Sequence, residues 1–216
     1  MINTQNVIEM LIIAAITIIS ITIHEFSHGY VSYMLGDDTP KVYRRLTLNP
    51  LKHLDVIGAI CLAIFHFGWA KPVPINPNNY KNKKLGVLAV SLAGPISNIL
   101  LAFIATVLYV FVSEKNVYFN TALLVCVSLN FSLAVFNLLP IPPLDGSRIV
   151  SILLPQRARN KYNAFEKYSP FVIFFIFLVP VLGSVLTAFI DFISQWIFKG
   201  FIITKKQTEK ISVCFG

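Results

Sequence analysis

The sequence predicts an all-α polytopic membrane protein, and three observations support that prediction. Of the 216 residues, 56% are hydrophobic and only 13% are charged, which is unlike a water-soluble domain. Apolar stretches long enough to cross a bilayer recur along the chain. The basic residues gather beside those stretches, as in the loops of membrane proteins. We therefore expect a core of three transmembrane helices with a re-entrant or extended loop between the first two, followed by a C-terminal span or helical hairpin.

We expect a single domain over residues 1–216, with a core over 5–150 and a C-terminal membrane segment over 165–203. Residues 1–6 contain no Lys or Arg, and no small-residue cleavage site precedes the first motif, so the first apolar segment should stay in the mature chain. A net charge of +8 would suit nucleic acid in a soluble protein. Here the cations flank apolar segments, so we expect no nucleic-acid partner.

The first apolar stretch, from about Val7 to Leu35, contains the motif His24-Glu25-Phe26-Ser27-His28. On a helix the two histidines lie four residues apart on one face and can bind one metal ion, with Glu25 beside them to transfer a proton. Ionisable side chains are expensive to bury inside a transmembrane segment, so a functional site is the default interpretation. The motif therefore predicts a hydrolytic zinc site.

The charge pattern around this helix predicts its orientation. Its start is nearly uncharged, whereas four basic residues follow Gly36: Lys41, Arg44, Arg45 and Lys52. This asymmetry places the N-terminus outside and the region after Gly36 in the cytoplasm. His24 lies about 25 Å along the helix from Val7, in an apolar core about 30 Å thick. We expect the metal in the cytoplasmic half of the bilayer.

The apolar stretch over 56–67 is short for a span. If it crossed the membrane, the lysines that follow it would lie outside, against the usual bias, so we expect a re-entrant element. After it, residues 68–77 contain three prolines at spacings that exclude a helix interior. This segment is a candidate strand or polyproline edge.

Residues 85–112 are long enough to span and contain the sequence SLAGPISN. Small residues let helices approach closely, and Pro95 loosens the local hydrogen-bond ladder. Two interpretations of Asn98 stay open: tight packing near a kink, or an amide that faces a polar cavity and donates to an oxyanion.

The chain returns through residues 119–139, which bring Asn130 and Asn137 onto one face seven residues apart. Buried amides need hydrogen-bond partners. The segment ends in NLLPIPPLDG, where prolines stop the helix and Asp145 follows in extended chain at about the membrane depth of the histidines. Asp145 could complete the site, because two imidazoles and one carboxylate leave one tetrahedral position open for water.

Beyond Asp145 we expect a short helix over 147–154 and a cytoplasmic basic loop over 157–167. The last apolar region, 171–198, is interrupted by Pro180 and Gly183. It is either one bent span or a hairpin, and the lysines after it favour the hairpin.

Two histidines and three cysteines lie outside these motifs. His53 and His66 have no metal-ligand spacing to another donor, so we expect them to be structural. Cys61, Cys126 and Cys214 form no CxxC pair, which argues against a disulfide scaffold or a thiolate metal site.

Together HEFSH, SLAGPISN and NLLPIPPLDG, in this order, resemble the site-2 protease family of intramembrane zinc metalloproteases. The resemblance covers most of the chain, and GWAKPVPINP before SLAGPISN looks most like the short bacterial members without a PDZ or CBS domain. It implies one zinc ion per chain, bound by His24, His28 and Asp145. It further implies that Glu25 is the catalytic glutamate and that Asn137 helps to stabilise the transition state.

The resemblance also implies a hydrolase of the cell membrane, a metalloendopeptidase that cuts peptide bonds within or near transmembrane segments in regulated intramembrane proteolysis. Its expected partners are a transmembrane protein substrate, the lipid bilayer and a regulatory membrane protein.

Three other classes of function fit these residues less well. A catalytically silent binding or chaperone module would not need Glu25 beside both histidines. A transporter predicts polar residues spread across the membrane, whereas here they gather near one depth. A mononuclear iron oxidase with two histidines and one carboxylate would leave Glu25 without a role.

Overall fold

The computed structural model describes residues 4–55, 58, 70–112, 116–168 and 188. The predicted re-entrant element over 56–67, apart from residue 58, and the C-terminal span or hairpin over 171–198, apart from residue 188, lie outside the described residues. His66, Cys61 and Cys214 also lie outside them.

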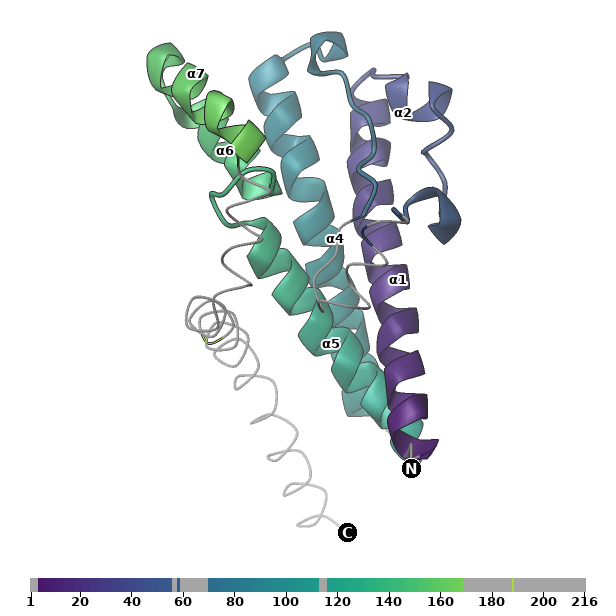
Figure 1. The fold of residues 1–216 in the computed structure, drawn as a ribbon. Helices are drawn as coiled ribbons and strands as arrows, with labels where there is room; N and C mark the ends of the chain where they lie inside the picture. The colour runs from purple at the N-terminus through teal and green to yellow at the C-terminus, as the bar shows by residue number, and fades with distance from the viewer. Residues whose placement is uncertain (1–3, 56–57, 59–69, 113–115, 169–187, 189–216) are drawn as a thin grey trace, which may run out of the picture.

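Three long helices run side by side and form the body of the molecule: α1 (Thr4–Met34), α4 (Lys83–Phe111) and α5 (Val117–Asn137) (Figure 1). Each is long and apolar enough to cross a membrane. Within the described part of the chain there is no strand, only an isolated bridge between Leu54 and Ala70. The prediction of an all-helical membrane protein with three spans is confirmed.

The shorter elements lie at the end of the bundle away from the N-terminus (Figure 1). They follow in chain order as α2 (Thr39–Val42), η1 (Pro50–Lys52), η2 (Pro77–Asn79), α6 (Asp145–Leu153), α7 (Gln156–Phe165) and η3 (Glu166–Tyr168). The predicted helix over 147–154 is α6, but it begins two residues earlier. Asp145 therefore lies in the first turn of a helix and not in extended chain.

Asparagine side chains start several of these elements. Each accepts a backbone N–H from the first turn and so satisfies one of the donors that a helix start leaves unpaired. The capping residues are Asn49 of η1, Asn76 of η2, Asn82 of α4 and Asn116 of α5. These caps explain why η1, η2 and the two later spans begin where they do.

Helix α4 lies between α1 and α5 and packs against both. Toward its C-terminal end it forms an apolar cluster with α5, made of Ala102, Ala105, Leu123 and Val127. Large apolar side chains elsewhere on the spans are exposed, Phe103 and Met10 among them, as expected for surfaces that face lipid.

Residues 71–76, which we call the extended segment, contain no helix and lie beside α1. This agrees with the expectation for a proline-rich stretch. One end of the extended segment is tied to the end of α1 by Asp37, which is fully buried. Its carboxylate accepts hydrogen bonds from Asn76 N–H (2.7 Å), Asn79 Nδ2 (2.8 Å), Ser32 Oγ (2.8 Å) and Thr39. Burial alone would raise the pKa of Asp37, but these donors lower it to about 2.

Candidate metal centre

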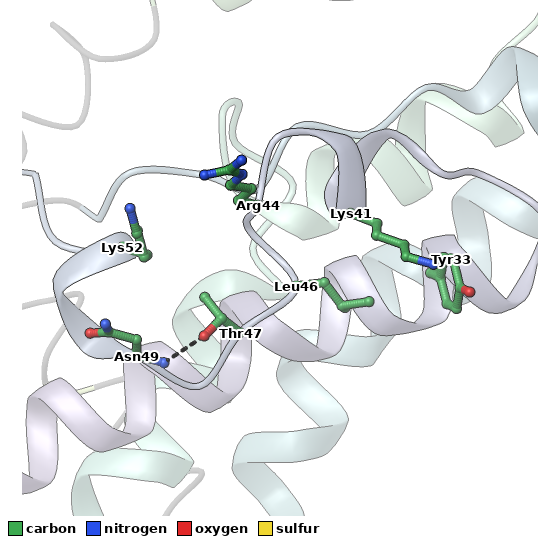
Figure 2. Close-up of a pocket in the computed structure, with 7 residues that line it drawn as sticks. All are labelled: Tyr33, Lys41, Arg44, Leu46, Thr47, Asn49 and Lys52. Atoms are coloured by element: carbon green, nitrogen blue, oxygen red, sulfur yellow. Dashed lines mark hydrogen bonds between the residues drawn. The ribbon is translucent and has the colours of Figure 1, made fainter.

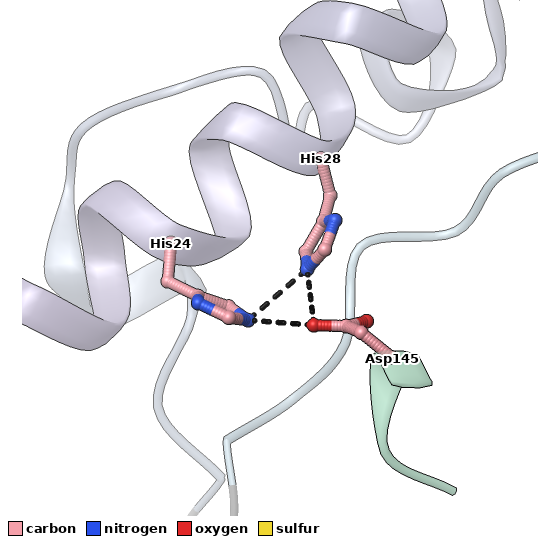
Figure 3. A group of neighbouring side chains, drawn as sticks. All are labelled: His24, His28 and Asp145. Atoms are coloured by element: carbon pink, nitrogen blue, oxygen red, sulfur yellow. Dashed lines mark hydrogen bonds and ion pairs between the residues drawn. The ribbon is translucent and has the colours of Figure 1, made fainter. Parts of the chain in front are cut away.

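Three side chains from distant parts of the sequence converge between the helices (Figure 3). His24 and His28 project from one face of α1, and Asp145 reaches them from the first turn of α6. His24 Nε2 and His28 Nε2 lie 3.1 Å apart, and Asp145 Oδ2 lies 3.2 Å and 3.1 Å from them. All three residues are buried. The structure therefore brings together the two histidines and the aspartate singled out in the sequence.

The second nitrogen of each imidazole is held by α4. His28 Nδ1 lies 2.6 Å from the backbone carbonyl of Val90, which can only accept a hydrogen bond. His24 Nδ1 lies 2.5 Å from Asn98 Oδ1. Each Nδ1 is therefore the donor of its hydrogen bond, and each Nε2 faces the centre, where it can bind a metal ion.

The orientation of Asn98 is itself fixed from α5. Asn130 Nδ2 donates to the backbone carbonyl of Cys126 (2.8 Å) and to Ser20 Oγ (2.9 Å), so its oxygen faces the other way. Asn98 Nδ2 donates to that oxygen (2.7 Å), which leaves Asn98 Oδ1 for His24. Asn98 and Asn130 are fully buried. The Cys126 carbonyl thus sets the tautomer of His24 through two amides.

This arrangement fits a zinc ion. Two imidazole nitrogens and one carboxylate oxygen face one another, and in the described part of the chain the buried Asp145 Oδ2 has no contact with a polar group other than these two histidines. Tetrahedral zinc with bonds of about 2.0–2.1 Å places its ligand atoms about 3.3 Å apart, close to the observed separations. Zinc accepts this combination of nitrogen and oxygen ligands and would relieve the repulsion between the lone pairs.

Two glycines make room for this cluster. A Cβ on Gly94 of α4 would lie 2.6 Å from His24 Nε2 and 2.5 Å from its Cε1. A Cβ on Gly146 would lie 2.5 Å from the carbonyl oxygen of Leu139, so only glycine lets the start of α6 pack against the end of α5. Gly94 therefore leaves room for the imidazoles, and Gly146 allows the close packing that brings Asp145 to them.

Glu25 lies next to the cluster and contacts the extended segment. Its Oε2 accepts a hydrogen bond from Val73 N–H (3.0 Å). Val73 is buried and comes close to α1 at Gly29, where an added Cβ would lie 3.1 Å from Val73 Cγ1. The close approach that Gly29 allows gives the carboxylate a fixed donor on one oxygen.

The structure also places the other polar residues that the sequence analysis singled out. Asn98 is a hydrogen-bond bridge between His24 and Asn130, as the packing interpretation expects, and its amide N–H₂ points toward α5. Asn137 lies at the end of α5, partly buried, where its Nδ2 donates to Leu133 O of its own helix (2.9 Å). His53 is fully buried and its Nε2 contacts the backbone carbonyl of Thr47 (2.7 Å), in keeping with a structural residue.

Sequence reasoning missed four contributors to the centre: the Val90 carbonyl, Gly94, Ser20 and Val73 N–H. Two of these are backbone groups, which no residue type reveals. Gly94 had a signal, because a glycine four residues before a buried asparagine on the helix facing the histidines marks a close approach. Asn130 was singled out as a buried amide in need of partners, and the structure supplies them.

Comparison with known proteins places this centre in a family. The profile of Peptidase family M50 matches residues 115–180. The curated "Putative zinc metalloprotease YwhC" of Bacillus subtilis is 45% identical over 175 residues, covering 77% of this chain and 80% of the relative. The proteins named "Putative zinc metalloprotease Rip2" of Mycobacterium tuberculosis H37Rv and Mycolicibacterium smegmatis are 28% and 24% identical, each covering 77% of this chain and 66% of the relative.

No solved structure matches the chain significantly. The identity to the Bacillus subtilis relative extends over most of both sequences, and the family profile covers the segment with Asp145. The protein therefore belongs to peptidase family M50, the site-2 protease family, and is a membrane-embedded zinc metalloprotease.

Proposed function

We propose that this protein is an endopeptidase that hydrolyses peptide bonds within or near transmembrane segments of membrane proteins, with one zinc ion bound by His24, His28 and Asp145. The observation that carries the proposal is that His24 Nε2, His28 Nε2 and Asp145 Oδ2 lie close together, buried in a bundle of helices that are long and apolar enough to cross a membrane. A metal site at that place can act on peptide bonds that soluble proteases do not reach.

Glu25 is proposed as the general base and later the general acid. When bound, zinc lowers the pKa of a water ligand toward neutrality and polarises the substrate carbonyl. Glu25 accepts the proton of that water and returns it to the leaving amine. Val73 N–H holds one carboxylate oxygen (3.0 Å), which leaves the other oxygen for the proton.

Asn137 is proposed to donate to the oxyanion, as the family resemblance implies. In the present arrangement its amide donates to Leu133 O, so this role requires a change of rotamer when substrate binds. Replacing Asn137 with Ala should lower kcat by roughly 100-fold or more if it donates to the transition state. A drop in kcat of less than about threefold would remove Asn137 from the catalytic groups.

The proposed orientation places the N-terminus outside and the metal centre in the cytoplasmic half of the cell membrane. It is supported by the nearly uncharged start of α1 and by the basic residues that follow α1. Cysteine-accessibility labelling in intact cells at residue 5 and at residue 52 tests it, because only the first should react with an impermeant reagent added outside.

A helical substrate must unwind before attack, and its freed backbone groups then need partners in hydrocarbon. We propose that the extended segment supplies them by pairing with the substrate as a strand. Arg45 donates to the carbonyls of Lys71 and Pro72, Val73 N–H donates to Glu25, and Asp37 accepts Asn76 N–H. The groups left for pairing are therefore the carbonyls of residues 73–75 and the N–H of Ile75. If replacing 73–75 with Gly-Ser-Gly leaves cleavage unchanged, pairing here does not occur.

The proposed function is tested by metal content and cleavage together. The detergent-purified wild type should contain about one zinc per chain and should cleave a reconstituted transmembrane substrate. Asp145→Ala should lose zinc and activity. Glu25→Gln should keep zinc and lose at least about 100-fold in kcat.

Three outcomes would contradict the proposal. Zinc binding that is indifferent to Asp145→Ala would break the link between the two halves of the site. Cleavage of soluble peptides but of no membrane-embedded substrate would leave a metalloprotease without the intramembrane specificity. Full zinc occupancy without any cleavage would favour a silent binding module.

A further inference from the structure

The structure has a cavity that none of the proposed metal ligands lines. Its volume is about 470 Å³, and it lies between the start of α4, the extended segment and the pair α6 and α7. Four of its lining residues are cationic: Lys83, Lys84, Arg148 and Arg159. None of the described residues that line it is acidic. Three separate elements thus direct positive charge into one hollow.

Two of these cations are already held by neighbours and two are not. Lys83 Nζ donates to Asn78 Oδ1 (2.7 Å), and Arg159 donates to the last carbonyls of α6, including Ser151 O (2.7 Å). In the described part of the chain, neither Lys84 nor Arg148 has a hydrogen-bond or ion-pair partner. The cavity is therefore lined by two cations, Lys84 of α4 and Arg148 of α6, that no acidic group of the described chain neutralises.

The position of the lysines breaks a local rule. Lys83 and Lys84 occupy the first turn of α4, which has no acidic residue, although the start of a helix is the positive end of its dipole. Cations there are unfavourable unless an anion is bound nearby, and first-turn N–H groups favour one. The charges of α6 and α7 meet the cavity from the opposite wall.

A different pocket near the end of α1 is also lined by basic residues and serves as a comparison (Figure 2). Its cations Lys41, Arg44 and Lys52 are exposed and all lie in the stretch 41–52 after α1, which includes part of α2 and all of η1. Lys41 lies over the ring of Tyr33, 5.4 Å from its centroid, while Arg44 and Lys52 extend away from that ring (Figure 2). These cations lie close together in the sequence, whereas those that line the cavity beside α6 come from α4, α6 and α7.

We propose that the cavity between α4, α6 and α7 binds a phosphate group, and that the headgroup of an acidic phospholipid supplies it. The cavity lies at the end of a 29-residue span, at the depth where lipid headgroups meet a transmembrane helix. A phosphate there would pair with Lys84 and Arg148 and so tie α4 to the helix that presents Asp145. This binding site is separate from the proposed catalytic groups.

The test is saturable stabilisation of the full-length protein in a neutral detergent. Thermal unfolding is followed with dihexanoyl phosphatidylglycerol, with dihexanoyl phosphatidylcholine, and with inorganic phosphate against chloride at equal ionic strength. We expect phosphatidylglycerol to raise Tm saturably and phosphatidylcholine not to. Stabilisation by inorganic phosphate alone would keep the phosphate site and replace the lipid by a soluble ligand. No saturable shift with any of these probes would overturn the proposal.

Matched variants separate the cavity from general surface charge. Lys84→Gln with Arg148→Gln should raise the apparent Kd for phosphatidylglycerol roughly tenfold to thirtyfold, and each single substitution roughly threefold to fivefold. Arg157→Gln with Lys161→Gln removes the same charge from exposed positions of α7 that do not line the cavity, and should change Kd less than about twofold. Equal effects of the two double variants would overturn the proposal. Retained zinc reports that each variant is folded, and the single substitutions serve if the double variant loses it.

Discussion

The two halves of α4 bury different kinds of side chain against the neighbouring helices. Between Gly86 and Asn98 its buried residues include two glycines, a serine and an amide beside Val90 and Pro95, and the Val90 carbonyl accepts a hydrogen bond from His28. From Ala102 to Thr106 they are small and mostly apolar, and they pack on Leu123 of α5. In the first half Val90, Gly94 and Asn98 each lie against a histidine, whereas in the second half packing is shared among many contacts.

The difference shows how a membrane helix can combine a reactive site with a stable scaffold. Apolar packing between helices is graded, because lipid is as apolar as the helix surface it replaces. A buried polar group, by contrast, has one or two possible partners and loses much when they are removed. We therefore expect substitutions of first-half residues that contact the histidines to affect zinc binding, and those in the second half to affect only stability.

The largest effect is expected from Gly94→Ala. The new Cβ would lie 2.6 Å from His24 Nε2, so the imidazoles must move away from Asp145. Zinc affinity should fall roughly 100-fold or more, measured by competition with a fluorescent chelator. Gly86→Ala is the matched control, because its Cβ would meet the Tyr80 ring (2.8 Å from Cγ) on the same helix without touching a histidine. Equal zinc loss in both variants would mean that α4 packing alone governs the site.

The next effect concerns the amide chain. Asn98→Ala removes the acceptor that fixes the tautomer of His24, and it leaves Asn130 without its partner. Zinc affinity should fall about 10-fold to 100-fold, as for other partners of metal-binding histidines. Asn137→Ala removes an amide that bonds within its own helix and should leave zinc affinity unchanged. The tautomer argument fails if Asn98→Ala binds zinc as tightly as the wild type.

A substitution in the apolar half should do the reverse. Leu123→Ala opens a space in the cluster with Ala102, Ala105 and Val127. We expect the free energy of unfolding in mixed micelles to fall by about 1–3 kcal/mol, with zinc affinity within about twofold of the wild type. A large loss of zinc affinity in this variant would show that the two halves of α4 are coupled.

The smallest effect is a pH dependence that arises outside the bundle, at Asp37. Its pKa is lowered to about 2 by its hydrogen-bond donors, so its contribution to stability is complete above the ordinary value of 3.8 and is lost as pH falls toward 2. As the pH falls from about 4 to about 2, amide exchange of residues 71–76 should therefore become faster relative to the intrinsic exchange rate at each pH. Asp37→Asn should remove that step and raise exchange at neutral pH. An unchanged step in Asp37→Asn would assign it to another group.

The fold class and the three spans could be predicted because hydrophobic length is written directly in composition. His24, His28 and Asp145 were predicted to act together because their residue types are rare in apolar segments and because the motifs follow the family order. The Val90 carbonyl and Val73 N–H could not be predicted, since every residue carries such groups and only the packing of α4 and the extended segment selects them. The two interpretations of Asn98 could not be separated either, because the sequence does not say which way an amide points.

The arrival of Asp145 from a late helix has a consequence for how the chain is held together. A zinc ion bound by α1 and α6 would act as a cross-link between the beginning of the chain and its second half, much as a disulfide does in a secreted protein. The metal would then contribute to assembly as well as to chemistry. Cells short of zinc would accumulate a protein whose last helices are docked only by side-chain contacts, and such a protein is an easy target for quality-control proteolysis.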